Sequence, residues 1–227
     1  MKKTVFLTIG QAPRLDLEDI FHHFFDRDSV DQAGLLDGLT LEEAINTYGI
    51  LPDTKEVLIS RLVDGTTIKM DHTLVQDALK KKVTKLEADG YEIIVILCTS
   101  VFHGLSTQTA LLVEPETIIS REVIRKTGTG RLGIVVPLKE QITVPEDKWN
   151  QAVNRLSLFC SPYSGNEEDF LQIGEQFSAQ KADLVILDCM GYHTKMKNWI
   201  QNTFHGEVWL SNEVLFEYVK QKAKEPV

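Results

Sequence analysis

Two cysteines that follow buried strands are the residues best suited to chemistry in this sequence. Cys98 comes directly after the apolar run 93–97, and Cys189 follows the run 184–187 with one aspartate between them. In an open parallel sheet, ligands bind beyond the carboxyl ends of the strands, so both thiols are expected to contact a substrate. We expect a helix to begin after each cysteine. The N–H groups at the N-terminus of such a helix favour the thiolate form of the cysteine.

A pair of thiols facing one substrate suits proton transfer at carbon, and we predict Cys98 and Cys189 as the catalytic acid and base. One thiolate removes a proton from a carbon beside a carbonyl group, and the other thiol returns a proton to the opposite face. The site must also stabilise the enolate that forms and keep water out. Polar residues at strand ends are candidates for binding the substrate in this way: Thr8, Thr99, Ser100, Ser211 and Asn212.

The loop 11–14 after the first apolar run offers a candidate for binding a substrate carboxylate. Arg14 carries a planar guanidinium group that matches a carboxylate, and Gln11 belongs to the same loop. The alternative for Arg14 is an ion pair with Asp16 or Glu18, and the sequence supports both interpretations equally.

The loop after Cys189 contributes two further substrate-binding candidates, Gly191 and His193. His193 is suited to donating a proton; the alternatives are half of a metal site with the thiol, or a loop histidine bonded to backbone. Cys160, inside an apolar run, is expected to be a core residue. The sequence offers no second pair of metal ligands, so we predict neither a metal nor a cofactor.

Strand-like and helix-like patterns alternate along the chain. Short continuous apolar runs predict buried strands at 4–9, 93–97, 132–136 and 184–187. Apolar residues spaced three and four apart predict helices at 15–25, 73–89, 146–155 and 167–180. The segment 56–70, which contains Asp64-Gly65, predicts a β-hairpin. This alternation indicates an α/β protein with mainly parallel sheets flanked by helices.

The sequence resembles itself at an offset of 91 residues. This offset superposes 90–100 on 181–191 and thereby aligns the two candidate cysteines. The same offset, without a gap, superposes 116–124 on 207–215. A duplicated unit with the cysteines in equivalent positions explains both matches.

The duplication predicts two pseudo-symmetric lobes. We expect the first lobe at 1–127 and the second at 128–211, with a C-terminal helix at 212–227 that packs back on the first lobe. Lobes that face each other across a pseudo-twofold axis bring the two sulfur atoms to opposite sides of one bound molecule.

Composition excludes several classes of protein. The chain has 227 residues, 43% of them hydrophobic, which supports a well-formed core. Its net charge of -9 argues against sequence-independent nucleic-acid binding, which needs a basic surface. No signal peptide is expected, and no apolar run approaches the roughly 20 residues of a membrane span. Three cysteines without a CxxC pair fit a reducing compartment, so we expect a cytoplasmic protein.

Three motifs resemble the AroM-like family: TIGQAPR at 8–14, LDCMGYH at 187–193 and LSNEVL at 210–215. The resemblance runs over nearly the whole chain, and the family is similar to the broader aspartate/glutamate/hydantoin racemase superfamily. Members of that superfamily have two pseudo-symmetric lobes with a cysteine from each, and the resemblance implies a homodimer.

The residues around the cysteines partly follow the superfamily pattern. The run 188–191 is similar to the Gly-Cys-Ala-Gly of hydantoin racemases, and the run 98–100 resembles the first-lobe cysteine followed by small polar residues. Asp188 replaces a small residue, and a carboxylate beside sulfur raises a thiol pKa unless it points elsewhere. The threonine that amino-acid racemases carry after the second cysteine is missing. These departures favour a carbon acid other than glutamate or aspartate.

We therefore expect a cofactor-independent racemase or isomerase that moves a proton through cysteine on a small anionic substrate. The substrate class is a carboxylate, an amino acid or a hydantoin-like molecule. One alternative is a decarboxylase or cis–trans isomerase with a single essential cysteine, as the resemblance to superfamily relatives implies. The other alternative is a noncatalytic protein that binds small metabolites in the same cleft.

Overall fold

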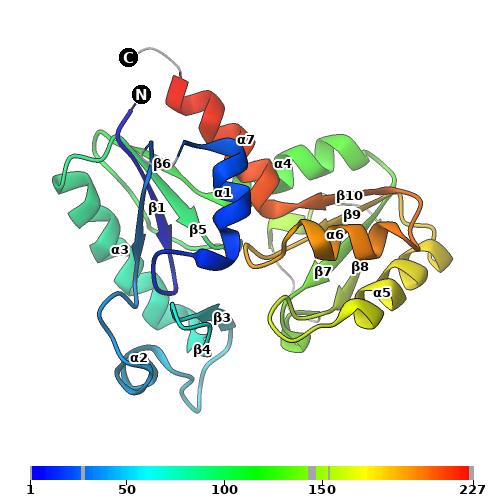
Figure 1. The fold of residues 1–227 in the computed structure, drawn as a ribbon, viewed down its shortest axis with the longest axis horizontal. Helices are drawn as coiled ribbons and strands as arrows, with labels where there is room; N and C mark the ends of the chain where they lie inside the picture. The colour runs from blue at the N-terminus through cyan, green and yellow to red at the C-terminus, as the bar shows by residue number, and fades with distance from the viewer. Residues whose placement is uncertain (1, 27–28, 143–146, 153, 225–227) are drawn as a thin grey trace. The chain divides into compact units, whose positions relative to one another are not determined.

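The chain folds into two compact units, shown in the ribbon of the computed structural model (Figure 1), which describes residues 2–26, 29–142, 147–152 and 154–224. Unit 1 comprises the residues up to 115 and those from 217 onward, and unit 2 comprises residues 116–216. The sequence predicts a boundary between the lobes after residue 127, at the C-terminal end of helix α4 (Pro115–Thr127). In the structure the boundary lies after residue 115, at the N-terminal end of the same helix.

Unit 1 is built on a parallel sheet with the strand order β2-β1-β5-β6. Its strands are β1 (Thr4–Thr8), β2 (Asp31–Gly34), β5 (Ile93–Leu97) and β6 (Leu111–Val113). Every residue of β1 and β5 is buried, as continuous apolar runs predict for strands that are covered on both faces. The two strands predicted in this half of the chain are confirmed.

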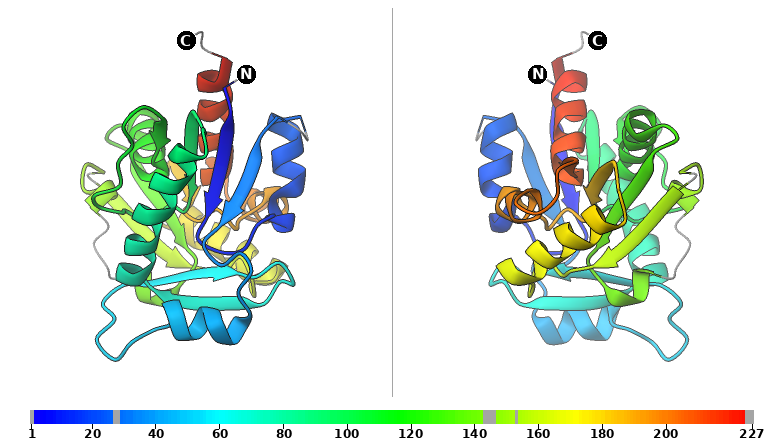
Figure 2. Two further views of the ribbon diagram at one scale, coloured as in Figure 1. Left: turned by 90° about the vertical axis from the view of Figure 1, so that its left-hand side faces the viewer. Right: turned by 90° about the vertical axis from the view of Figure 1, so that its right-hand side faces the viewer.

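Helices cover both faces of the unit 1 sheet (Figure 2). Val5 and Leu7 belong to the core cluster that also contains the buried side of α3 (His72–Ala88). Phe6 points to the opposite face, because side chains alternate along a strand. There its ring packs against Phe21 of α1 (Glu18–Phe24), with ring centroids 5.0 Å apart.

A hairpin and a short helix are inserted between β2 and β5. Strands β3 (Val57–Arg61) and β4 (Thr67–Asp71) pair antiparallel, as the sequence predicts. Gly65 in the turn has a φ of 90°, a conformation that glycine adopts without strain. Helix α2 (Leu41–Tyr48) precedes the hairpin and begins with a capping box formed by Thr40 and Glu43.

Unit 2 is also built on a parallel sheet, with the strand order β10-β9-β7-β8. Its strands are β7 (Arg131–Val136), β8 (Asn154–Phe159), β9 (Leu184–Leu187) and β10 (Glu207–Leu210), and its helices include α5 (Glu167–Ala179), α6 (Thr194–Gln201) and the start of α7 (Ser211–Lys224). Gly133 lets α5 pack closely on β7, because a Cβ there would lie 2.7 Å from the ring of Phe177.

The two sheets have the same order when β1 is matched with β7, β2 with β8, β5 with β9 and β6 with β10. The predicted α/β class with two similar lobes is therefore confirmed. Within this correspondence the offset of 91 holds for β5 and β9, which begin at Ile93 and Leu184.

The ungapped register predicted beyond the cysteines is wrong. It superposes residues of helix α4 on 207–210, which form strand β10. Helices α4 and α7 do correspond, but they begin at Pro115 and Ser211, 96 residues apart. The second half needs extra residues there because α6 lies between its cysteine and its last strand.

The helix predicted at 146–155 is also wrong, although residues 146 and 153 lie outside the described part of the chain. Asp147–Trp149 form one 3₁₀ turn, and Asn154 begins strand β8. The apolar spacing around Trp149 imitates a helix, but β8 pairs with β7 along its whole length, so sheet pairing decides the structure.

Glu87 at the end of α3 provides a pH-dependent test of unit 1. Its carboxylate accepts backbone N–H groups of Ala110, Thr109 and Gln108, and these bonds lower its pKa from 4.5 to about 2. A carboxyl with a lowered pKa stabilises the fold above its unfolded pKa, and this stability is lost as pH falls through the folded value. We expect Glu87→Gln to lower the free energy of unfolding in urea at pH 7, and the difference from wild type to shrink steadily below about pH 4.5.

The control for this prediction is Glu42→Gln on the exposed side of α2, which should leave the pH dependence unchanged. A Glu87→Gln deficit of the same size at pH 7 and pH 3 would contradict the assignment.

Candidate active site

Cys98 and Cys189 occupy equivalent positions, each relative to its own sheet. Strand β5 pairs with β1, and β9 pairs with β7 in the same parallel manner. Each cysteine is the fifth residue after the first paired residue of its strand, Ile93 or Leu184. Both therefore lie just beyond the carboxyl end of a strand, where open parallel sheets bind ligands.

The loop after Cys189 presents a backbone N–H to the sulfur, and no helix begins directly after the cysteine. The expectation of a helix directly after the cysteine is wrong, since α6 begins only at Thr194. Instead the N–H of Gly191 points at Cys189 Sγ, with an N to Sγ distance of 3.4 Å. The N–H of Tyr192 donates to the Cys189 carbonyl oxygen at 3.4 Å, which closes a turn.

Asn212, in the first turn of α7, holds this turn in place. Its fully buried side-chain Nδ2 donates to the carbonyl oxygens of Met190 at 3.1 Å and Tyr192 at 2.7 Å. The neighbouring Ser211 donates its hydroxyl to the carbonyl oxygen of Leu187 at 3.0 Å, which fastens the start of α7 to the end of β9. Both residues were predicted to bind substrate, and both side chains bond to backbone.

The loop after Cys98 is held by helix α3 instead. No helix lies between this cysteine and β6, because the described chain runs through an irregular loop to Leu111. His72 Nε2 donates to the carbonyl oxygen of Val101 at 2.8 Å, and Gln76 Oε1 accepts the N–H of His103 at 2.6 Å. Of the predicted site residues in this loop, Thr99 is buried, whereas Cys98 and Ser100 are partly exposed.

Asp188, next to the second cysteine, forms a buried ion pair. Its carboxylate oxygens lie 3.0 and 2.8 Å from Lys148 Nζ, and Trp149 Nε1 donates to it at 3.0 Å. The side chains of Lys148 and Asp188 are only 3% and 1% exposed. The carboxylate charge is therefore balanced by a lysine that the sequence did not single out.

Two tyrosines that were not predicted from the sequence lie at the Cys189 turn, Tyr192 within it and Tyr163 beside it. Tyr192 is fully buried and donates its hydroxyl to the carbonyl oxygen of Cys160 at 2.6 Å, and burial raises its pKa well above the ordinary value. The hydroxyl of Tyr163 lies against Gly191, since a Cβ on that glycine would be 2.6 Å from it. Only glycine fits there. A tyrosine in a polar loop directly after a strand was the available signal for Tyr163.

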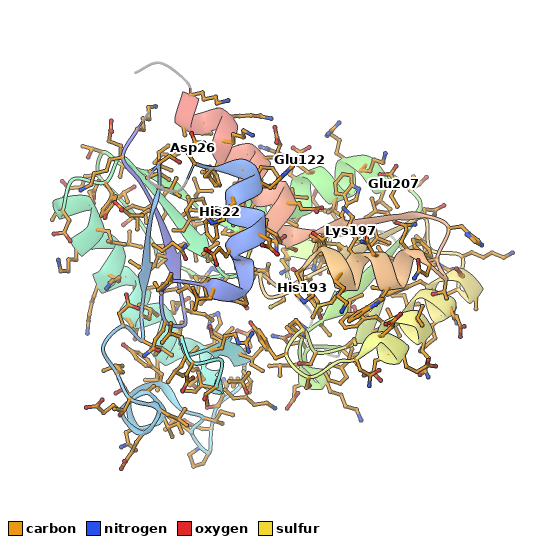
Figure 3. The ribbon with its side chains drawn as sticks, in the orientation of Figure 1. His22, Asp26, Glu122, His193, Lys197 and Glu207 are labelled. Atoms are coloured by element: carbon orange, nitrogen blue, oxygen red, sulfur yellow. The ribbon has the colours of Figure 1, made fainter. Side chains whose placement is uncertain are left out.

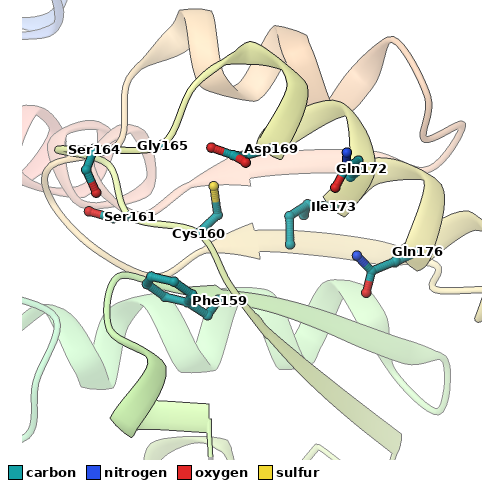
Figure 4. A pocket seen from close by; sticks show the side chains of 9 residues that line it. All are labelled: Phe159, Cys160, Ser161, Ser164, Gly165, Asp169, Gln172, Ile173 and Gln176. Carbon is teal, nitrogen blue, oxygen red and sulfur yellow. The ribbon is translucent and has the colours of Figure 1, made fainter.

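Cys160 behaves as the predicted core residue. It is 4% exposed, and burial together with the charge of Asp169 raises its pKa to about 12, so the thiol stays neutral at physiological pH. Beside it lies a cavity of about 270 Å³ between the end of β8 and α5 (Figure 4). The cavity is lined by Phe159, Cys160, Ser161, Ser164, Gly165, Asp169, Gln172, Ile173 and Gln176.

In unit 1, Arg14 forms the ion pair that was the alternative to carboxylate binding. Its Nε and Nη2 donate to both oxygens of Asp16 at 2.8 and 2.7 Å, and Nη1 donates to Thr8 Oγ1 at 3.3 Å. Burial by itself raises the pKa of Asp16, but the bonds and charge of Arg14 and the charge of Arg61 hold it below its usual value. This guanidinium is 4% exposed and already bound on both edges.

Gln11 ties the inserted hairpin to the sheet. Its Nε2 donates to the carbonyl oxygens of Leu36 and Leu39 at 3.0 and 2.8 Å, and its Oε1 accepts the N–H of Val63 at 2.9 Å. Its backbone N–H donates to the carbonyl oxygen of Arg61 at 3.1 Å. The amide predicted to contact substrate thus connects three segments of unit 1.

His193 occupies the N-cap position of α6 and is partly exposed, and Figure 3 shows it at the start of that helix. One turn further along α6, Lys197 forms an ion pair with Glu213 of α7 at 2.7 Å. Among the described residues, no cluster of three His, Cys, Asp or Glu side chains is arranged to hold a metal ion. None of the described helices is long and apolar enough to cross a membrane.

The sequence matches the model of a known family. The profile described as AroM protein covers residues 5–221. The chain belongs to the AroM family. A search of curated proteins gives no match to this AroM-family sequence.

Solved structures share the fold of this AroM-family chain at low sequence identity. Arylmalonate decarboxylase matches with a TM-score of 0.63 and 11% identity over 99% of this chain and 94% of the other. Allantoin racemase from Klebsiella pneumoniae matches with 0.59 and 10% over 98% and 88%. Glutamate racemase from Francisella tularensis, in complex with D-glutamate, matches with 0.57 and 12% over 97% and 81%. These matches show that the chain shares its fold with these three proteins.

The Lys148–Asp188 pair predicts a strong and recoverable loss of stability. Lys148→Met leaves a buried carboxylate without its cation and should cost about 3 to 5 kcal/mol of unfolding free energy. Adding Asp188→Asn removes the uncompensated charge and should recover most of that loss. The double-mutant cycle is measured by denaturant unfolding at pH 7, and additive effects of the two substitutions would contradict the pairing.

Proposed function

We propose that this AroM-family protein is a cofactor-independent enzyme that moves a proton at the carbon beside a carboxylate or carbonyl group of a small anionic substrate. The observation that carries the proposal is the contact between the Gly191 N–H and Cys189 Sγ, at the carboxyl end of β9. A backbone N–H that donates to sulfur favours the thiolate, which is the form that acts as a base.

In the racemase form of the reaction, two thiols share the work. The thiolate of one cysteine takes the proton from carbon, so that a C–H bond breaks and an S–H bond forms. The electron pair left on carbon spreads into the adjacent carbonyl as an enolate. The thiol of the other cysteine then donates its proton to the opposite face. We assign these roles to Cys189 and to Cys98, its counterpart in unit 1.

Groups around the two thiols supply the remaining requirements. We assign hydrogen bonding to the developing enolate to the hydroxyl groups of Thr99 and Ser100, with Tyr163 beside Gly191 and His193 as additional donors. Thr8, Gln11 and Arg14 hold the first-unit loop in shape through the bonds described above. The homodimer and the cytoplasmic location remain predictions from the sequence.

The second candidate function is decarboxylation with one essential cysteine. The fold match to arylmalonate decarboxylase favours it, as does the difference between the two cysteine loops. In this reaction the bond from carbon to a carboxylate breaks, carbon dioxide leaves, and the electron pair remains on carbon. Cys189 then donates its proton to that carbon, and Cys98 has no chemical role.

Proton exchange in heavy water tests both functions. The purified protein is incubated with single enantiomers of amino acids, hydantoins and 2-substituted malonates, and the α-proton and the products are followed by NMR. We expect exchange or decarboxylation with one class, and a loss of about 10² to 10⁴ in rate for Cys189→Ala, since removing the acid or base forfeits that factor. Cys98→Ala should be similarly impaired in a racemase and active in a decarboxylase.

Cys160→Ala is the matched control and should retain the activity, because that thiol stays protonated in the core. A protein that turns over none of the three classes would leave only the noncatalytic metabolite binder, whereas a Cys189→Ala variant with wild-type rates would reject Cys189 as the reacting group.

A short bifunctional thiol reagent such as dibromobimane separates the two-thiol mechanism from the one-thiol mechanism. Each cysteine lies on its own tryptic peptide: 86–121, 156–181 and 182–195. If Cys98 and Cys189 address one substrate, the reagent should join peptide 86–121 to peptide 182–195, and prior substrate should protect. Separate modification of both thiols without a cross-link would exclude the two-thiol mechanism.

A further inference from the structure

The position of Asn212 has a consequence for the chemistry of Cys189 that neither residue reveals alone. Asn212 Nδ2 donates to the carbonyl oxygens of both Met190 and Tyr192, which flank Gly191. The Oδ1 and Nδ2 atoms of Asn212 cannot exchange positions, because Oδ1 would then face two carbonyl oxygens. The two carbonyl oxygens therefore fix the orientation of the asparagine side chain, and its two hydrogen bonds in return hold the turn.

Peptide geometry carries this contact to the sulfur. The carbonyl oxygen of Met190 and the N–H of Gly191 belong to one planar trans peptide unit, so they point in opposite directions. When Asn212 binds that oxygen, the N–H on the other side of the same plane is aimed away from α7. In this structure it is aimed at Cys189 Sγ.

We propose that Asn212 is a positioning residue that orients the Met190–Gly191 peptide so that its N–H stabilises the thiolate of Cys189. Asn212 was predicted from the sequence to contact the substrate; in the structure it acts through the backbone and touches no reacting atom. The inference deepens the proposed function and rests on it only in so far as Cys189 is the reacting group.

The anchoring of Asn212 makes this role effective. On one side, the Ser211 hydroxyl bonds to the carbonyl oxygen of Leu187 at the end of β9. On the other side, Glu213 pairs with Lys197 of α6 at 2.7 Å. The asparagine is thus held between two elements that also border the turn.

The cost of keeping an asparagine here supports a functional role. Asn212 is fully buried, and its Oδ1 accepts no hydrogen bond from any described residue. A buried acceptor without a donor destabilises a fold, so an apolar residue would be preferred if packing alone mattered. The benefit that offsets this cost is the pair of bonds from Nδ2 to the turn.

Site-resolved alkylation of the folded protein tests the proposal. Iodoacetamide is applied in short pulses between pH 5 and pH 10, and the rate for Cys189 is read from peptide 182–195 by mass spectrometry. We expect Asn212→Ala to slow alkylation of Cys189 at pH 7 about tenfold, which corresponds to one unit in the midpoint of the rate profile. The rate at high pH, where every molecule is a thiolate, should stay near that of wild type.

The high-pH rate separates thiolate stabilisation from simple access to the sulfur. The other titratable groups around the turn are present in both proteins: Asp188, Lys148, Tyr163, Tyr192, Cys160 and His193. Thr203→Val is the matched control, because Thr203 Oγ1 donates to the carbonyl oxygen of Leu171 elsewhere in unit 2. It removes a comparable bond and should leave the Cys189 profile unchanged.

A second measurement needs no substitution and tests the contact between Gly191 and Cys189 on which the proposal depends, even if Asn212→Ala fails to fold. In ¹⁵N-labelled wild-type protein, the Gly191 amide resonance should shift with pH at the same midpoint as Cys189 alkylation. A Gly191 amide that does not respond, or an Asn212→Ala profile identical to wild type, would overturn the proposal. Because neither readout uses turnover, a shifted profile without proton exchange would retain this inference and reject only the proposed enzyme.

Discussion

Parallel pairing between a central strand and the strand that precedes a cysteine underlies the architecture of both units. β1 pairs with β5 from Ile93 onward and β7 pairs with β9 from Leu184 onward, so each thiol emerges at the carboxyl edge of its sheet. A parallel pair requires a crossover that returns the chain to the starting edge, and α3 and α5 supply it. The helices bury both faces of the central strands, which is why these strands are continuous apolar runs.

Each unit also buries one ion pair close to the carboxyl edge of its sheet. Arg14 and Asp16 follow β1, and Lys148 and Asp188 follow β7 and β9. In both pairs the charge of one side chain is balanced by the other, so their fields largely cancel at longer range. The reactivity of a cysteine nearby is then governed by its immediate backbone, such as the N–H of Gly191.

The two cysteine loops differ in what holds them, and this difference bears on mechanism. Asn212 holds the Cys189 turn through hydrogen bonds to its carbonyl oxygens, and the hydroxyl of Tyr163 packs against Gly191. The Cys98 loop is supported by two side chains of α3, His72 and Gln76, through backbone atoms further along the loop. The two units therefore place their thiols at equivalent strand ends, while the groups that hold each loop differ.

The sequence by itself determined the class of the fold, the central strands and the location of the two cysteines, because buried parallel strands leave an apolar signature that is local. It also identified the motifs 8–14, 187–193 and 210–215. Tertiary structure alone decided that Gln11 and Asn212 bond to backbone, that Arg14 pairs with Asp16, and that Lys148 balances Asp188. These partners lie up to 52 residues apart, and a polar side chain carries no sequence signal for which buried group it will meet. The same limit explains β8, where pairing with a distant strand overrode a helical spacing.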